Sequence, residues 1–177
     1  MENLKKVKDV FFNCNIVDNN FCDADIEEIK FSKKLNAVIL NAKSNSLKVS
    51  LNDIENFENQ AKTAYDLSSF KVNYTYTGTP FDINVSDIKD TLSSMNSKYQ
   101  YTQDIFENCK IDFDSDTCAL DITLNRPFSG FVKIKGIDNY IAKDIESKFG
   151  KKLKVNISDN KDLKVENVDK DAHKMVK

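Results

Sequence analysis

The sequence contains one short pattern twice, and this repeat restricts the possible folds more than any other feature. Residues 9–16 read Asp-Val-Phe-Phe-Asn-Cys-Asn-Ile, and residues 104–111 read Asp-Ile-Phe-Glu-Asn-Cys-Lys-Ile. A second match follows in the same order, since residues 71–74 read Lys-Val-Asn-Tyr and residues 154–157 read Lys-Val-Asn-Ile. Matches in a common order predict a tandem duplication of one small unit, with the extra length of the first copy in residues 17–25.

Hydrophobic patterning predicts the order helix, strand, strand, helix, strand in the first copy. Apolar residues at steps of three and four predict a helix over residues 2–12, and alternation predicts a hairpin and a closing strand. Ser50, with Asp53 three residues later, is typical of a helix N-terminus. The expected strands are Ile26–Phe31, Ala37–Ala42 and Phe70–Tyr76. The expected buried stripe of the helix after Ser50 is Leu51, Ile54, Phe57, Ala61, Ala64 and Tyr65.

The second copy shows the same order of elements. Ser86 with Asp87 predicts the start of a helix that carries Ile88, Leu92 and Met95. Gly150 predicts the end of the last helix. The expected segments are strands at 109–113 and 119–124, a loop at 125–130, a short extended segment at 131–135, a helix at 137–149 and a strand at 153–157. The expected buried side chains of that last helix are Ile137, Tyr140, Ile141, Ile145 and Phe149.

These patterns predict an α+β fold made of two tandem αββαβ units. The Thr-Gly-Thr-Pro segment at residues 77–80 predicts the boundary, so the units span residues 1–78 and 79–157, and residues 158–177 form a charged linker or tail. The element order resembles the bacterial, type II, KH topology. KH domains grip nucleic acid with a GxxG loop, and neither copy contains one. The resemblance therefore concerns shape more than activity.

Cysteine and histidine usage disfavours several kinds of site. The four cysteines, Cys14, Cys22, Cys109 and Cys118, form no CxxC pair, and the only histidine is His173 in the charged tail. Structural zinc sites use close ligand pairs, and nucleophilic catalysis by serine or cysteine needs a nearby base. We therefore expect free, partly buried thiols, no metal site and no catalytic residue.

Alternating aspartates suggest a metal site that their spacing does not support. Asp112, Asp114 and Asp116 resemble the start of a calcium loop, yet its sixth and twelfth positions are Thr117 and Thr123 instead of glycine and glutamate. Alternation with apolar residues instead predicts a strand with one exposed face that runs into an acidic turn. The second acidic pair, Asp169 and Asp171, is simply solvated charge in the tail.

The charge balance disfavours an anionic partner for the chain as a whole. The formal net charge is −2, and Arg126 is the only arginine. No apolar run approaches the ~20 residues that span a bilayer, and the start of the sequence lacks the apolar core of a signal peptide. These features predict a cytoplasmic protein with no membrane partner.

Three stretches resemble a known family. Residues 5–14 read Lys-Lys-Val-Lys-Asp-Val-Phe-Phe-Asn-Cys, residues 26–36 read Ile-Glu-Glu-Ile-Lys-Phe-Ser-Lys-Lys-Leu-Asn, and residues 124–129 read Leu-Asn-Arg-Pro-Phe-Ser. They resemble the N-terminal region of PolC-type DNA polymerase III alpha subunits of low-GC Gram-positive bacteria such as clostridia. The resemblance extends over residues 1–157 and includes no catalytic motif.

The resemblance implies a non-catalytic interaction or positioning module of a replicative polymerase. The parent enzyme extends DNA and proofreads with a 3′–5′ exonuclease, and its magnesium-binding carboxylates lie in downstream domains, so no cofactor is expected in these residues. The family region is KH-like and similar to the alpha-binding end of the clamp-loader tau subunit. That similarity implies replisome proteins such as tau as partners.

An accessory single-stranded nucleic-acid-binding module is the alternative function. Basic side chains beside exposed rings can neutralise phosphate and stack on bases. The residues that would serve this purpose are Arg126, Phe128, Phe131, Lys133 and Lys135. For the two phenylalanines, packing in the core is the competing interpretation.

Overall fold

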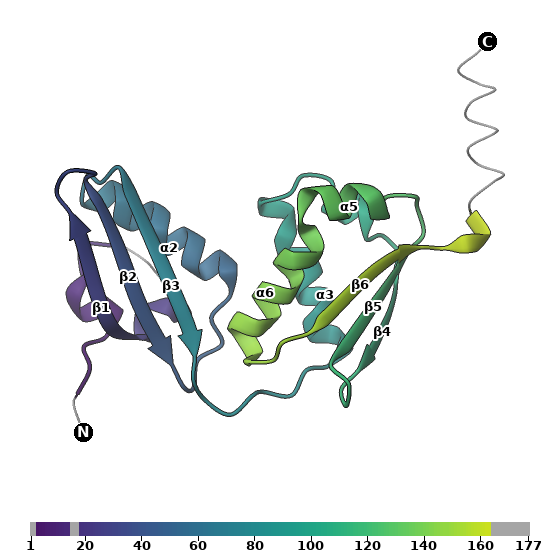
Figure 1. The fold of residues 1–177 in the computed structure, drawn as a ribbon, viewed down its shortest axis with the longest axis horizontal. Coiled ribbons are helices and arrows are strands. Elements are labelled where there is room, and N and C mark those ends of the chain that lie inside the picture. Colours follow the sequence, from purple (N-terminus) through teal and green to yellow (C-terminus); the bar gives the residue numbers. More distant parts are fainter. Residues whose placement is uncertain (1–2, 15–17, 164–177) are drawn as a thin grey trace, which may run out of the picture. The chain divides into compact units, whose positions relative to one another are not determined.

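The computed structural model is an α+β fold with two three-stranded sheets (Figure 1), and it describes residues 3–14 and 18–163. Contacts divide the chain into two compact units. The first comprises the described residues up to 82 together with 144–151, and the second comprises 83–143 together with the described residues from 152 onward.

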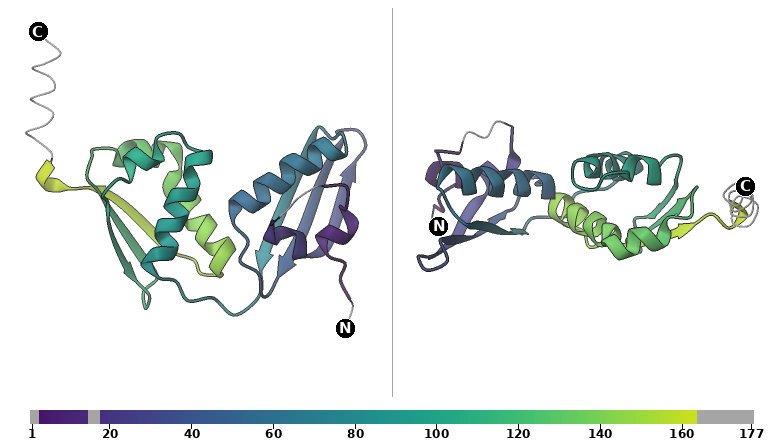
Figure 2. Two further views of the ribbon diagram at one scale, coloured as in Figure 1. Left: turned by 180° about the vertical axis from the view of Figure 1, so that it is seen from behind. Right: turned by 90° about the horizontal axis from the view of Figure 1, so that it is seen from above.

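The first unit has the predicted order of elements. They are α1 (Val7–Val10), the 3-10 helix η1 (Asn20–Asp23), β1 (Asp25–Ser32), β2 (Ala37–Ser44), α2 (Leu51–Ala64) and β3 (Ser69–Tyr76). The sheet order is β1-β2-β3, with β1 antiparallel and β3 parallel to the central strand β2. Helix α2 lies against one face of this sheet (Figures 1 and 2). The predicted hairpin, second helix and closing strand are therefore confirmed.

The first helix is much shorter than the predicted span of residues 2–12. It covers only Val7–Val10, because the residues before it pair with the start of β1. Lys6 has an extended backbone and forms a bridge with Asp25, and the Ile26 N–H donates to the Lys5 carbonyl at 2.9 Å. Helical spacing of apolar residues indicated helix here, but the free sheet edge binds this backbone in an extended form.

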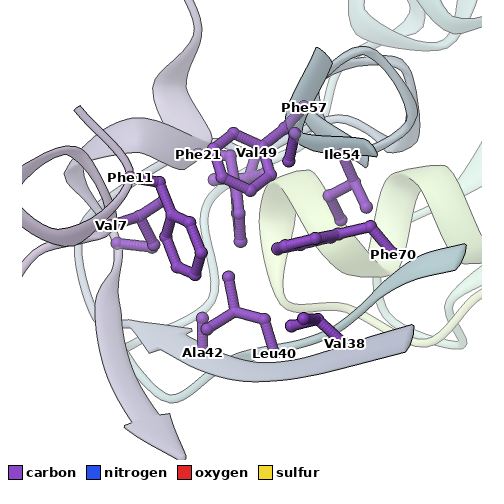
Figure 3. Packing of buried hydrophobic residues seen from close by; sticks show 12 residues of the cluster. Val7, Phe11, Phe21, Val38, Leu40, Ala42, Val49, Ile54, Phe57 and Phe70 are labelled. Carbon is purple, nitrogen blue, oxygen red and sulfur yellow. The ribbon is translucent and has the colours of Figure 1, made fainter. Parts of the chain in front are cut away.

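Aromatic rings fill the core of the first unit (Figure 3). The Phe57 ring of α2 meets Phe11, Phe21 and Phe70 edge-on, at centroid distances of 5.8, 4.9 and 5.6 Å. Buried β2 residues, Val38 among them, complete the cluster from the sheet. Such edge-to-face contacts add to the free energy gained from the buried area.

The predicted stripe of α2 is correct at its centre and wrong at its end. Ile54, Phe57 and Ala61 are buried, whereas Leu51 and Tyr65 are half-buried. Ala64, the last residue of the helix, is exposed although its spacing places it on the same side as the buried Phe57. Ser50 caps the helix as predicted: its hydroxyl accepts from the Asp53 N–H, and the Asp53 carboxylate accepts from the Ser50 N–H.

The second unit repeats the sheet with more helices around it. Its elements are α3 (Val85–Ser94), η2 (Met95–Ser97), α4 (Thr102–Ile105), β4 (Lys110–Asp114), β5 (Ala119–Leu124), α5 (Ser129–Lys135), the first half of α6 (Ile137–Phe149), β6 (Lys154–Asp159) and η3 (Lys161–Leu163). The residues of α6 from 144 onward are grouped with the first unit. The sheet order is β4-β5-β6, again with one antiparallel and one parallel pair. Its helices lie on one side of the sheet (Figure 2). The predicted bounds and buried residues of α6 are confirmed, and Gly150 follows it with a φ of 72°.

The segment predicted as extended at residues 131–135 is part of helix α5. Alternating apolar and basic residues suggested a strand, but the Val132 N–H donates to the Phe128 carbonyl at 2.9 Å, in the helical pattern. Gly136, with a φ of 69°, ends α5. Helix α6 then begins at once, so the two form a consecutive helical pair.

The first sequence match has the same local structure in both units. In each, the phenylalanine lies at the C-terminus of a four-residue helix, α1 or α4. The phenylalanine carbonyl then accepts from the cysteine N–H, at 3.1 Å from Cys14 to Phe11 and at 3.2 Å from Cys109 to Phe106. The pattern therefore encodes one helix-ending turn, used twice.

The second match also has one structural role in both units. Asn73 of β3 donates from Nδ2 to the side chain of Asn41 on the central strand at 2.9 Å. Asn156 of β6 does the same to Asp121 at 3.2 Å. The repeated Lys-Val-Asn stretch thus joins the closing strand to the central strand in each sheet.

Helix α3 begins earlier than predicted, since the sequence pattern indicated a start at Ser86. The structure places the cap at Asn84, whose side chain accepts from the Asp87 N–H at 3.0 Å.

Replacing a capping side chain with alanine costs about 1 kcal/mol. We expect Asn84→Ala to lower the free energy of unfolding by that amount in urea denaturation. Ser86→Ala should change it by less than about 0.5 kcal/mol, and equal losses would contradict the assigned cap.

Candidate functional site

Strand β1 exposes two large apolar side chains on the core face of the first sheet. Ile29 is 43% exposed and Phe31 is 60% exposed. Their direct partners on β2 are Leu40 and Val38, which are buried, and directly paired residues of antiparallel strands share a face. Ile29 and Phe31, the β1 strip, therefore extend the core face beyond the part that is covered.

The chain itself occupies the first positions on the free edge of β1. Lys5 accepts from Ile26, Lys6 forms the bridge to Asp25, and the Val7 N–H donates to the Ala24 carbonyl at 2.9 Å. Within the described part of the chain, residues 27–32 have no strand partner on this edge. A hollow of about 580 Å³ lies beside it, lined by Asn3, Leu4, Lys5, Val10, Ile26 and Ile29. The remaining edge could thus accept a further strand.

Charged groups around the β1 strip are mostly paired with one another. Glu28 contacts Lys30 at 3.4 Å, and Glu27 contacts Lys43 at 3.1 Å. At the end of α1, Lys8 contacts Asp23 at 2.6 Å, and this hydrogen bond raises the pKa of the Lys8 ammonium. Because these charges offset each other, the apolar side chains dominate the chemistry of this surface.

The structure brings together only two of the five residues that the sequence suggested for nucleic-acid binding. Phe131 and Lys135 lie one turn apart on α5, with the Lys135 Nζ 5.8 Å from the centre of the Phe131 ring. Lys133 is exposed and points about 200° around the helix from Lys135. Phe128 is half-buried at the start of α5, and the exposed Arg126 pairs with Glu107 at 3.4 Å.

A groove beside α5 adds residues that the sequence analysis missed. It has a volume of about 330 Å³, and its lining includes Lys98, Tyr99, Tyr101, Phe131, Lys135 and Ile137. Tyr101 is 69% exposed and Phe131 is 40% exposed, so the expectation that Phe131 packs in the core is wrong. In the sequence, these residues are marked only by the Lys-Tyr-Gln-Tyr stretch at residues 98–101, where two aromatic residues lie close to a lysine.

Tyr101 holds an unusual backbone conformation at this groove. Its φ is 73°, in the left-handed region, where a residue other than glycine is strained. Asparagine and aspartate account for most of the other positive φ values outside glycine in the described residues, and their short side chains tolerate the conformation. The chain thus keeps a strained tyrosine where its ring is exposed.

The strain at Tyr101 should be measurable. Tyr101→Gly should raise the free energy of unfolding by about 1 kcal/mol, because glycine adopts this φ without a clash. Tyr101→Ala removes the same ring but keeps the clash, so it should bring no gain. Urea denaturation of both variants checks this, and equal stabilities would contradict the strain.

The alternating aspartates form a strand and turn, as predicted. Asp112 and Asp114 lie in β4, and the Asp114 carboxylate accepts from the N–H groups of Asp116 and Thr117 at 2.9 and 3.4 Å. These hydrogen bonds lower the pKa of Asp114. In the described residues, no group of three or more histidine, cysteine or acidic side chains is placed to hold a metal ion. Asp169, Asp171 and His173 lie outside the described residues.

The four cysteines are free thiols and each is half-buried. Burial raises the pKa of Cys14, Cys22 and Cys109, and for Cys22 the nearby Asp23 carboxylate adds to the effect. A raised pKa lowers the fraction of thiolate, which is the reactive form. These three residues are therefore poorly suited to nucleophilic chemistry at neutral pH.

Alkylation rates should show the effect of burial and raised pKa on these thiols. At neutral pH we expect iodoacetamide to modify Cys14, Cys22 and Cys109 more slowly in the folded chain than in the same chain in urea, as measured by peptide mass spectrometry. Equal rates in the two states would mean that the folded environment neither buries these thiols nor raises their pKa.

No family model matches the chain, and no curated protein matches its sequence. Among the described residues, none of the helices has the length and apolar character needed to cross a membrane.

Proposed function

We propose that this chain is a non-catalytic interaction module, the N-terminal region of a PolC-type DNA polymerase III alpha subunit, that positions the polymerase within the replisome. Support comes from the sequence resemblance at residues 5–14, 26–36 and 124–129 and from the exposed β1 strip. In this proposal, DNA synthesis and proofreading with magnesium belong to other parts of the parent protein, and the module works in the cytoplasm.

The free edge of β1 is the observation that carries the proposal. A short segment of this chain, Lys5 and Lys6, already pairs with the first residues of that edge. An extended segment of a partner protein can continue the same pairing, with backbone hydrogen bonds supplying affinity and side-chain pockets supplying specificity. Ile29 and the hollow beside it would receive an apolar side chain of that segment.

The expected partner is a replisome protein, and the resemblance points first to the clamp-loader tau subunit. Docking through an apolar edge depends mainly on buried area and backbone hydrogen bonds. Salt screens exposed charges but has little effect on these forces, so binding should persist at moderate ionic strength.

Two isoleucines of the same sheet provide a matched test. Ile29 and Ile39 are 43% and 42% exposed, but Ile39 lies on the opposite face of the sheet from the buried Leu40. We expect Ile29→Thr to weaken binding to purified tau about fivefold or more, because buried apolar area is lost. Ile39→Thr should leave the affinity within about twofold. Isothermal titration calorimetry measures both.

Three outcomes would contradict the proposal. If the unaltered chain does not bind tau, tau is excluded as the partner. If Ile29→Thr and Ile39→Thr weaken binding equally, the β1 edge is excluded as the binding site. A dimer in light scattering that Ile29→Thr dissociates would show that a second copy of the chain occupies this edge instead.

A further inference from the structure

The groove beside α5 combines two exposed rings with two ammonium groups. Tyr101 and Phe131 supply the rings, and Lys98 and Lys135 lie at the same hollow. Each lysine also lies near a ring, with Lys98 Nζ 4.9 Å from the centre of Tyr140 and Lys135 Nζ 5.8 Å from that of Phe131. Among the described residues, no carboxylate lines this groove.

Charge is separated along the second unit in a way that favours an anionic ligand here. Residues 126–135 contain no acidic residue. Of their three basic residues, Lys135 lies at the groove, whereas Arg126 pairs with Glu107 and Lys133 points about 200° around the helix from Lys135. Residues 110–121, which form the β4–β5 hairpin, contain four aspartates and one lysine. Among the described residues, neither Lys133 nor Lys135 forms an ion pair. In the part of the chain that the structure describes, Lys135 therefore brings a positive charge without an ion-pair partner to the groove, although the overall charge is near neutral.

We propose that this groove binds single-stranded nucleic acid, with bases stacking on Tyr101 and Phe131 and phosphates contacting Lys98 and Lys135. Rings stack on any unpaired base, and nearby cations neutralise the backbone. The bases of a duplex are already stacked on each other, so their faces cannot reach the rings. The proposal goes beyond docking at β1, because it uses a different unit and none of the same residues.

Two independent ring substitutions test the stacking. Tyr101→Asn removes the ring and keeps a residue that tolerates the left-handed backbone, and Phe131→Leu removes a ring but keeps an apolar helix former. The probe is a fluorescein-labelled oligothymidylate of about 16 nucleotides, titrated with the full chain at about 50 mM salt. Each substitution should weaken binding roughly tenfold in fluorescence anisotropy. Phe12→Leu, at a ring that is 75% exposed in the first unit, should leave binding unchanged.

A matched pair of lysines tests the phosphate contacts. Lys135→Gln should lower the affinity at about 50 mM salt and should reduce the slope of log affinity against log salt by about 0.7. Lys154→Gln makes the same charge change at an exposed position on β6 and should alter neither quantity. Circular dichroism of each variant checks that the second unit remains folded.

Several results would overturn the proposal. One is no binding of the unaltered chain at concentrations up to about 100 µM in low salt. Another is equal loss from Lys135→Gln and Lys154→Gln, which would indicate diffuse attraction. Unchanged affinity in both ring variants would exclude stacking. Equal competition by duplex DNA or by polyglutamate would show that the surface binds anionic polymers in general.

Discussion

Among the described residues, helices cover each sheet on one face only, and most other features follow from that. The central strands bury alternate residues, Leu40 in β2 and Leu120 in β5 among them, against helices on that face. In the first unit a single long helix, α2, packs there, and its Phe57 ring gathers the aromatic core. Together with the short α1 and η1, this helix leaves part of β1 uncovered, so Ile29 and Phe31 are 43% and 60% exposed.

The two surfaces rely on different forces. Around β1 the nearby charges pair with one another, so contact there would depend on apolar area and on backbone hydrogen bonds. Beside α5 the rings share the surface with lysines and with no described carboxylate, so Coulomb attraction would contribute and would weaken as salt increases. The two proposed ligands would therefore contact different residues, on separate units.

The sequence predicted the elements whose signals are local. Helix α2 has its cap at Ser50, helix α6 ends before Gly150, and both repeated patterns correspond to repeated hydrogen bonds. Predictions failed where distant groups decide the conformation. Lys5 and Lys6 are extended because a sheet edge binds them. Residues 131–135 alternate as a strand would, yet they are helical, with Val132 buried and Ile134 85% exposed.

Candidate sites were harder to predict than elements. Phe131 and Lys135 follow from their spacing on one helix, but Tyr101 and Lys98 come from an earlier segment that only the fold brings beside them. The exposure of Ile29 could not be predicted from the sequence either. Alternation along β1 shows which face of the sheet a residue occupies, but it does not show whether a helix covers that face.

The pairing of Lys5 and Lys6 with the start of β1 also limits what can be recognised there. In the described part of the chain, residues 27–32 are the ones left open on this edge, and six residues in extended form span about 20 Å. A ligand segment must therefore be short, and it meets the chain's own N-terminal backbone at one end and the hairpin at the other. Recognition of this kind would select a motif of about six residues, with its side chains alternating toward and away from the β1 strip.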